Sequence, residues 1–76
     1  MSQIRAWLTD RAIAFEYDEV GIIRLRAYGK DICIAKHKQG LYMVTYDMTC
    51  TECHTQKAVI NNVLIREFFT GYKQVK

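Results

Sequence analysis

The fold is decided by residues 22–46, which read IIRLRAYGKDICIAKHKQGLYMVTY. Apolar and polar residues alternate through most of this stretch, as they do in strands that bury one face. Gly29 and Gly40 interrupt the alternation with residues that favour turns. The stretch therefore predicts three antiparallel strands joined by two tight turns.

The first turn, Tyr28-Gly29-Lys30-Asp31, suits a two-residue loop with Gly29 at its first position, where a positive φ is required. The register that follows pairs Ala27 with Ile32, Leu25 with Ile34, Arg26 with Cys33 and Arg24 with Ala35. We expect the aliphatic pairs in the core and the mixed pairs on the opposite face.

The second turn, Lys38-Gln39-Gly40, fits a three-residue loop with Gly40 in the left-handed conformation. This loop places Tyr42, Val44 and Tyr46 on the core face. A two-residue loop would instead turn Leu41, Met43 and Thr45 inward, and a strand that is apolar on both faces permits either arrangement.

Upstream, Ser2 can cap a helix whose apolar residues Ile4, Trp7 and Leu8 follow helical spacing until about Arg11. The period then changes to two at Ile13, Phe15 and Tyr17, which predicts a first strand, and residues 18–21 read as a turn.

Downstream, Thr49 and Glu52 form a capping-box pattern that predicts the start of a last helix. Its apolar stripe would be Cys53, Ile60, Val63, Leu64 and Phe68, with Gly71 as the stop. The sequence thus predicts an α+β fold for residues 1–76, a single compact domain. In it a four-stranded antiparallel β-meander is flanked by an N-terminal and a C-terminal helix, in the order α-β-β-β-β-α.

Composition narrows the functional classes. The chain has 76 residues, a net charge of +3, three cysteines and no proline. Three cysteines are too few for a disulfide scaffold, and Arg5, Asp10 and Arg11 interrupt any secretory apolar run. No span of about 20 apolar residues occurs. We therefore expect a cytoplasmic protein with reduced thiols and no membrane partner.

Cys50-Thr51-Glu52-Cys53-His54 matches the attachment sequence of c-type haem, and the resemblance to c-type cytochromes covers these five residues. Attachment requires export, for which the sequence carries no signal. Zinc would need Cys33 or His37 as a further ligand, and a thioredoxin-like redox site would need a neighbouring proline. We expect no cofactor and no metal. A metal or haem protein built on Cys50, Cys53 and His54 remains a lesser alternative.

The second sheet face is the candidate binding surface. It is expected to carry Arg24, Arg26, Tyr28, Cys33, Ala35, His37, Leu41, Met43 and Thr45. Aromatic residues, Met and Arg are enriched at protein interfaces, which points to Arg24, Arg26, Tyr28, His37 and Met43 as partner-binding residues. The alternative is that one of the helices covers this face.

No catalytic arrangement of Ser, His, Asp or Cys residues can be placed from the sequence, so we expect no enzyme. The sequence favours a small non-enzymatic interaction module that sterically blocks a larger macromolecule, a protein or a protein–nucleic acid complex. In size and layout the chain resembles small inhibitors from phages and mobile elements, including anti-CRISPR proteins, which implies a host defence protein as target.

Two other partners are kept open. A nucleic acid could be bound with Arg24 and Arg26 on phosphates and Tyr28 stacked on a base, in a binding or regulatory protein. A second copy of the chain could form a homodimer through the same face.

Overall fold

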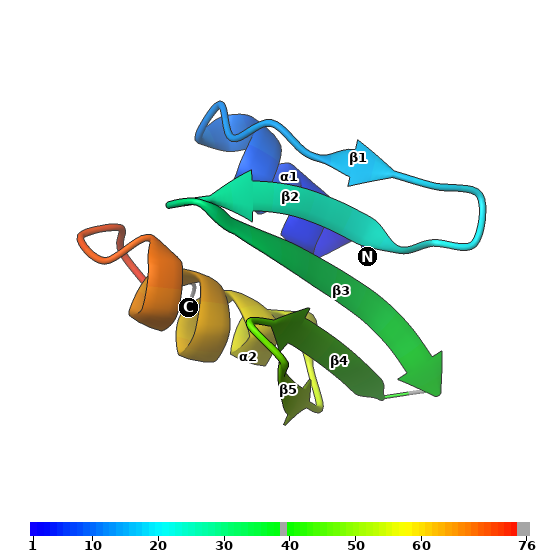
Figure 1. The fold of residues 1–76 in the computed structure, drawn as a ribbon. Coiled ribbons are helices and arrows are strands. Elements are labelled where there is room, and N and C mark those ends of the chain that lie inside the picture. The colour runs from blue at the N-terminus through cyan, green and yellow to red at the C-terminus, as the bar shows by residue number, and fades with distance from the viewer. Residues whose placement is uncertain (39, 75–76) are drawn as a thin grey trace.

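The computed structural model describes residues 1–38 and 40–74. Its elements run in the order α1 (Ser2–Asp10), β1 (Glu16–Tyr17), β2 (Ile23–Ala27), β3 (Lys30–Lys38), β4 (Leu41–Tyr46), β5 (Thr49–Cys53), α2 (Gln56–Val59) and the π-helix η1 (Ile60–Phe68). The strands form one antiparallel sheet in which sequence neighbours are also neighbours in space (Figure 1). The predicted α+β class is confirmed, with five strands rather than four.

The β2–β3 hairpin keeps the predicted faces but not the predicted register. Tyr28 and Gly29 have φ values of 53° and 76°, so they are the two loop residues, and both adopt the left-handed backbone of a hairpin turn. Leu25 therefore pairs with Ile32, and Arg24 with Cys33. Every predicted pair of this hairpin is displaced by two residues. Because side chains alternate with a period of two, each one still lies on its predicted face.

The β3–β4 hairpin places Tyr42 and Val44 in the core, as predicted. Gly40 has the predicted left-handed backbone, with a φ of 78°. Lys36 pairs with Tyr42 and Lys38 pairs with Leu41, so His37 is the extra residue of a bulge. Gln39 of the predicted loop lies outside the described residues.

The first strand is shorter than predicted. After α1 the chain reverses at Ala12, which has a φ of 56°, and the N–H of Ile13 donates to the carbonyl of Leu8 at 2.9 Å. Ile13 and Phe15 pack against the core from this irregular segment, and pairing with β2 begins only at Glu16.

The predicted capping box is wrong, because residues 49–53 form β5 instead of a helix start. Asp47 and Met48 both have positive φ and turn the chain back, so that Thr51 pairs with Val44. The last helix begins only at Gln56. Its N-cap is Thr55, whose hydroxyl accepts a hydrogen bond from the N–H of Ala58 at 3.0 Å.

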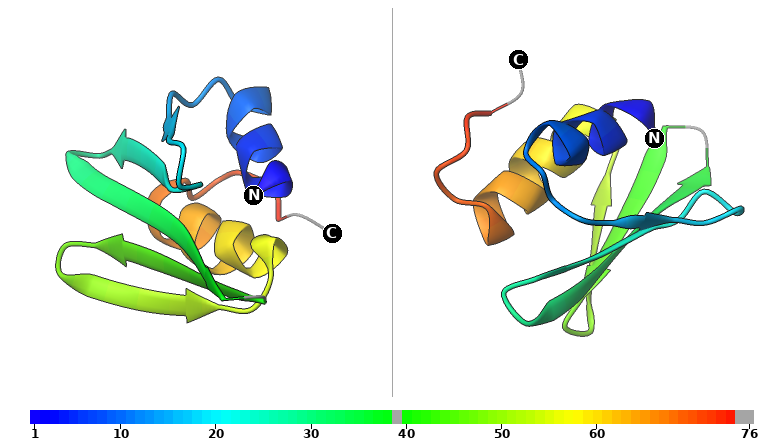
Figure 2. Two further views of the ribbon diagram at one scale, coloured as in Figure 1. Left: turned by 90° about the vertical axis from the view of Figure 1, so that its right-hand side faces the viewer. Right: turned by 90° about the horizontal axis from the view of Figure 1, so that it is seen from above.

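Both helical segments lie on one side of the sheet (Figure 2). Ser2 is the first helical residue of α1 and not its cap. At the N-terminal end of α1, the N–H groups of Gln3 and Ile4 have no partner within the helix. Both donate to the side-chain oxygen of Gln56 on α2, at 2.8 and 3.2 Å. Within the described residues, no helix combines the length and apolar character that crossing a bilayer requires.

The core lies between the helices and the sheet, and the predicted helix stripe of Ile60, Val63, Leu64 and Phe68 is buried there. The π-helical winding of η1 adds two residues to this buried stripe. The N–H of Phe69 donates to the carbonyl of Leu64, five residues back, at 2.7 Å. Ile65 and Phe69 are therefore buried as well, and the helix ends at Phe68, before the predicted stop at Gly71.

Candidate functional site

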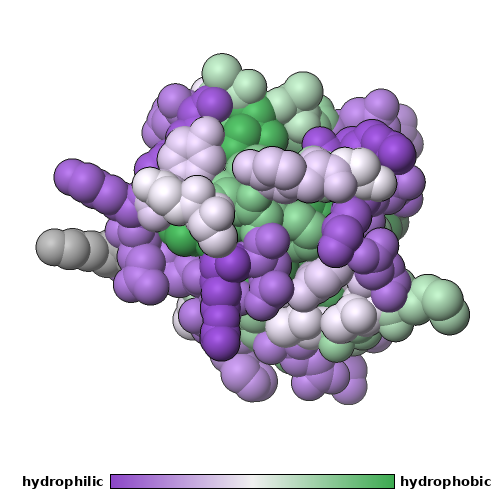
Figure 3. Space-filling model, turned by 60° about the vertical axis from the view of Figure 1, so that its left-hand side comes forward, coloured by the Kyte–Doolittle hydropathy of each residue, from purple (hydrophilic) through white to green (hydrophobic). Residues whose placement is uncertain are grey.

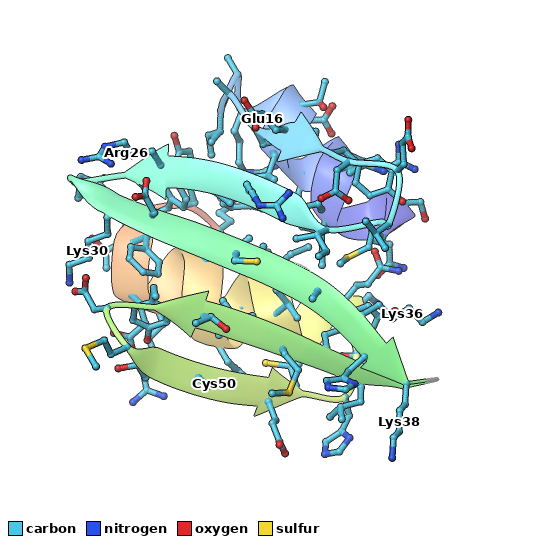
Figure 4. The ribbon with its side chains drawn as sticks, turned by 45° about the vertical axis from the view of Figure 1, so that its right-hand side comes forward. Glu16, Arg26, Lys30, Lys36, Lys38 and Cys50 are labelled. Carbon is cyan, nitrogen blue, oxygen red and sulfur yellow. The ribbon has the colours of Figure 1, made fainter. Side chains whose placement is uncertain are left out.

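The candidate site is the side of the sheet that faces away from the helices, here called the open face. Figure 4 looks onto it, with Glu16 on β1 at one edge and Cys50 on β5 at the other. The residues with side chains on this face are those that alternate with the core positions: Glu16, Arg24, Arg26, Asp31, Cys33, Ala35, Lys38, Leu41, Met43, Thr45, Cys50 and Glu52.

Small and weakly polar side chains occupy the middle of the open face. Cys33 lies opposite Thr45, and Thr45 lies opposite Cys50, where its hydroxyl approaches the sulfur at 4.0 Å. In the neighbouring row, Ala35 lies opposite Met43. Cys33, Ala35 and Met43 are half-buried by their neighbours. The centre is therefore largely apolar, and charged residues lie around it.

Both predicted arginines on the open face are paired with carboxylates of this chain. Arg24 donates to Asp18 from its guanidinium. Arg26 donates to Asp31 at 2.9 Å and to the carbonyl of Gly29 at 3.3 Å. Exposed pairs of this kind contribute little to stability, because water and salt screen them. Their consequence here is that the positive charge of the face is largely balanced.

Asp18 also organises the turn before β2. One carboxylate oxygen accepts from the N–H groups of Val20 and Ile22, both at 3.0 Å. The bond from Ile22, followed by the bond from Arg24, lowers the pKa of Asp18 below its ordinary value. The adjacent Asp18 in turn raises the pKa of Arg24.

Asp18→Asn is expected to lower stability at neutral pH and to have little effect in strong acid. A carboxyl group whose pKa is lower in the folded state stabilises the fold above its unfolded pKa of about 3.9, and that contribution is lost as the pH falls through the folded value. Asparagine keeps the oxygen that accepts from Val20 and Ile22 but loses the charge beside Arg24. Urea unfolding of both proteins between pH 7 and pH 2 measures the difference, and a difference that stays constant across this range would contradict the assignment.

A shallow hollow adjoins the arginines at the β1 edge. Its volume is about 640 Å³, and it is lined by Ala14, Phe15, Glu16, Arg24, Leu25, Arg26, Asp31, Ile32 and Cys33. It exists because β1 pairs over only two residues, so the segment before it leaves part of β2 uncovered. The open face is thus concave at this edge.

Two of the predicted site residues lie elsewhere. Tyr28 is a residue of the β2–β3 turn and not of a strand, so its ring leaves the open face and lies 6.1 Å from the ring of Phe69. His37 is the exposed bulge residue near the end of β3, at the margin of the face. Arg24, Arg26 and Met43 lie on the open face as predicted.

The Cys-x-x-Cys-His string lies mainly on β5, where residues three apart point to opposite sides. Cys50 is exposed on the open face, whereas Cys53 is buried in the core, and burial raises the pKa of its thiol. Thioether bonds to one haem, or thiolate bonds to one zinc ion, need both sulfurs on the same side. No cluster of metal-binding side chains occurs in residues 1–38 and 40–74.

Sequence reasoning missed Cys50 and Glu52 as surface residues because it assigned them to a helix. The sequence did contain a signal for a strand here, because Thr49 and Thr51 stand at alternate positions and β-branched residues favour strands. Asp31 was missed because it was assigned to the turn, whereas it pairs with Arg26 as a strand residue. Glu16 alternates with Phe15 and Tyr17, so the predicted first strand could have placed it on this face. Together these residues bring acidic groups to a face whose predicted charged residues were Arg24 and Arg26.

Comparisons with protein-family models, with curated proteins and with solved structures yield no match. The functional interpretation therefore depends on the chemistry and geometry of the open face.

Proposed function

We propose that this protein is a small binding domain that docks its open face on a larger protein and blocks the surface it occupies. The observation that supports this most strongly is the uncovered sheet, with Cys33, Ala35 and Met43 half-buried at its centre and neither helical segment lying over them. An apolar centre with paired charges beside it on β2 resembles the core and rim of a protein interface.

The charges of the open face favour a protein over a nucleic acid. Arg24 and Arg26 are both engaged by carboxylates, and Glu16 and Glu52 add negative charge to the same face. A phosphate backbone needs an excess of positive charge, and base stacking needs exposed aromatic rings. With Tyr28 in the turn, the described part of the open face presents no aromatic ring.

The proposed mode of action is steric. A sheet held by its own ladder of hydrogen bonds and by the core beneath it loses little conformational entropy when it docks. A partner whose working groove is covered in this way would be inhibited. This is the mode of action implied by the resemblance in size and layout to phage-encoded and anti-CRISPR inhibitors.

Ala35→Glu is expected to weaken partner binding at least about tenfold, or ~1.4 kcal/mol. The substitution places a charged side chain over the apolar centre, opposite Met43 and away from the arginine pairs. Partners would first be captured from the native cells with the tagged wild-type protein and identified by mass spectrometry. The affinity of each variant for the purified partner would then be measured by calorimetry.

The matched control is Ala6→Glu, which introduces the same side chain at an exposed position of α1, on the helical side. It should bind as the wild type does, and circular dichroism should show both variants folded. Equal affinity of the Ala35→Glu variant and the wild type would show that the open face is not the docking surface. A steep fall of affinity between low and moderate salt would instead indicate a nucleic acid partner.

A further inference from the structure

The two edge strands of the sheet, β1 and β5, differ in length and in how well they are protected from pairing with another chain. At one edge β1 pairs over only Glu16 and Tyr17, and such a short strand offers little for another chain to bind. At the other edge β5 runs for five residues, Thr49–Cys53. It contains no proline, lysine or arginine, and its pairing with β4 continues without a bulge. Apart from the single charge of Glu52, the usual protections of an exposed edge are therefore missing from β5.

The β4–β5 turn determines which backbone groups of β5 point outward. Asp47 and Met48 have φ values of 47° and 62°, as in a two-residue hairpin loop closed by a hydrogen-bonded pair, here Tyr46 and Thr49. Bonded and non-bonded pairs alternate along an antiparallel ladder. Thr49 and Thr51 therefore direct their N–H and C=O groups toward β4, whereas Cys50 and Glu52 direct theirs outward.

We propose that β5 pairs antiparallel with β5 of a second copy of this chain, with Thr51 on the two-fold axis. In this register Cys50 of each copy lies opposite Glu52 of the other. Each such pair exchanges both of its backbone hydrogen bonds, so every outward group of Cys50 and Glu52 is used. The two sheets then join into one continuous sheet whose open faces lie side by side.

The neighbouring registers are less favourable. A two-fold axis at Glu52 would place two carboxylates directly opposite each other, which destabilises a strand pair. An axis at Cys50 would bring the outward groups of Glu52 against residue 48 of the second copy, in the turn, where the backbone is left-handed and not extended. With the axis at Thr51, β-branched side chains meet on the helical side, and the glutamates are offset from each other. The strand is thus complementary to itself in one register.

A dimer formed by one strand pair is smaller than a standard interface, so we expect an equilibrium that depends on protein concentration. Sedimentation equilibrium of the reduced full chain over a range of concentrations would measure it. Two substitutions at Cys50 test the register. Cys50→Lys places an opposite charge across from Glu52 of the second copy and should tighten the dimer about two- to fivefold, whereas Cys50→Glu should weaken it by a similar factor.

Cross-linking tests the axis directly. In a Cys50→Ser background, Thr51→Cys brings the two introduced thiols together in a non-bonded pair, where Cα atoms lie about 4.5 Å apart, within disulfide reach. Mild oxidation should give a covalent dimer far faster than in the matched control, Cys50→Ser with Thr9→Cys, which places the thiol on exposed α1. Circular dichroism would confirm that each variant is folded.

A chain that stays monomeric at about 1 mM would overturn the proposal. So would a dimer that both Cys50→Lys and Cys50→Glu weaken, or one whose Thr51→Cys variant cross-links no faster than the control. The proposal does not depend on the binding function of the open face, because Ala35 lies on β3, two strands from this edge.

Discussion

Ile34→Ala is expected to lower the free energy of unfolding by about 2–5 kcal/mol. Ile34 lies on the central strand β3, its side chain is fully buried, and it pairs with Ile23 and Val44. The substitution leaves a cavity between the sheet and the helices. A domain of 76 residues has a total stability of roughly 4–11 kcal/mol, so this loss would leave the fold marginal.

Urea unfolding followed by circular dichroism measures this loss. The control is Val20→Ala, because Val20 is 83% exposed in the turn before β2 and its truncation should change stability by less than about 0.5 kcal/mol. If the two variants lost equal stability, Ile34 would not face the core, and the assignment of the sheet faces would be wrong.

Phe69→Ala is expected to lower the free energy of unfolding by about 3–5 kcal/mol. Phe69 follows η1 and joins three parts of the chain: its ring lies 5.8 Å from Trp7 on α1, 6.1 Å from Tyr28 in the β2–β3 turn and 5.9 Å from Tyr72. Figure 3 shows the end of the molecule where this turn and η1 lie, with hydrophobic atoms visible between hydrophilic side chains. Removing the ring would open this packing to water.

Trp7 reports on this packing, because it is the only tryptophan and is 4% exposed. Phe69→Ala should shift its fluorescence to longer wavelength even where the variant remains folded. Met48→Ala is the comparison, since Met48 is fully exposed in the β4–β5 turn. A fluorescence shift as large in Met48→Ala as in Phe69→Ala would contradict the central place of Phe69.

The faces of the sheet could be predicted even where the register could not. The β2–β3 loop comprises Tyr28 and Gly29 rather than Gly29 and Lys30, since Tyr28 adopts a positive φ that non-glycine residues seldom take. The resulting shift is even, so Leu25 and Ile32 kept their predicted side. In the next hairpin, the bulge at His37 kept Tyr42 and Val44 inside although Lys38 pairs with Leu41.

The candidate site was predicted in part, because alternation determines the face of a side chain but not its cross-strand neighbours. Arg24, Arg26 and Met43 lie on the open face because alternation alone placed them there. The charge of the face could not be predicted, because it depends on which carboxylates are brought beside the arginines. Asp31 reaches Arg26 only through the true register, and Asp18 reaches Arg24 through the turn before β2.

By itself, the sequence determined the alternation of residues 22–46, the apolar stripes of the two helical segments and therefore the α+β class, because these patterns are local and follow the periods of strand and helix. Only the tertiary structure decided the fate of residues 49–53. Thr49 and Thr55 can each cap a helix, and the chain between them becomes β5 because the backbone of β4 is available as its partner. In the same way, α1 is capped by Gln56, more than 50 residues away. Pairings of this kind depend on segments that are distant in sequence, which no local pattern records.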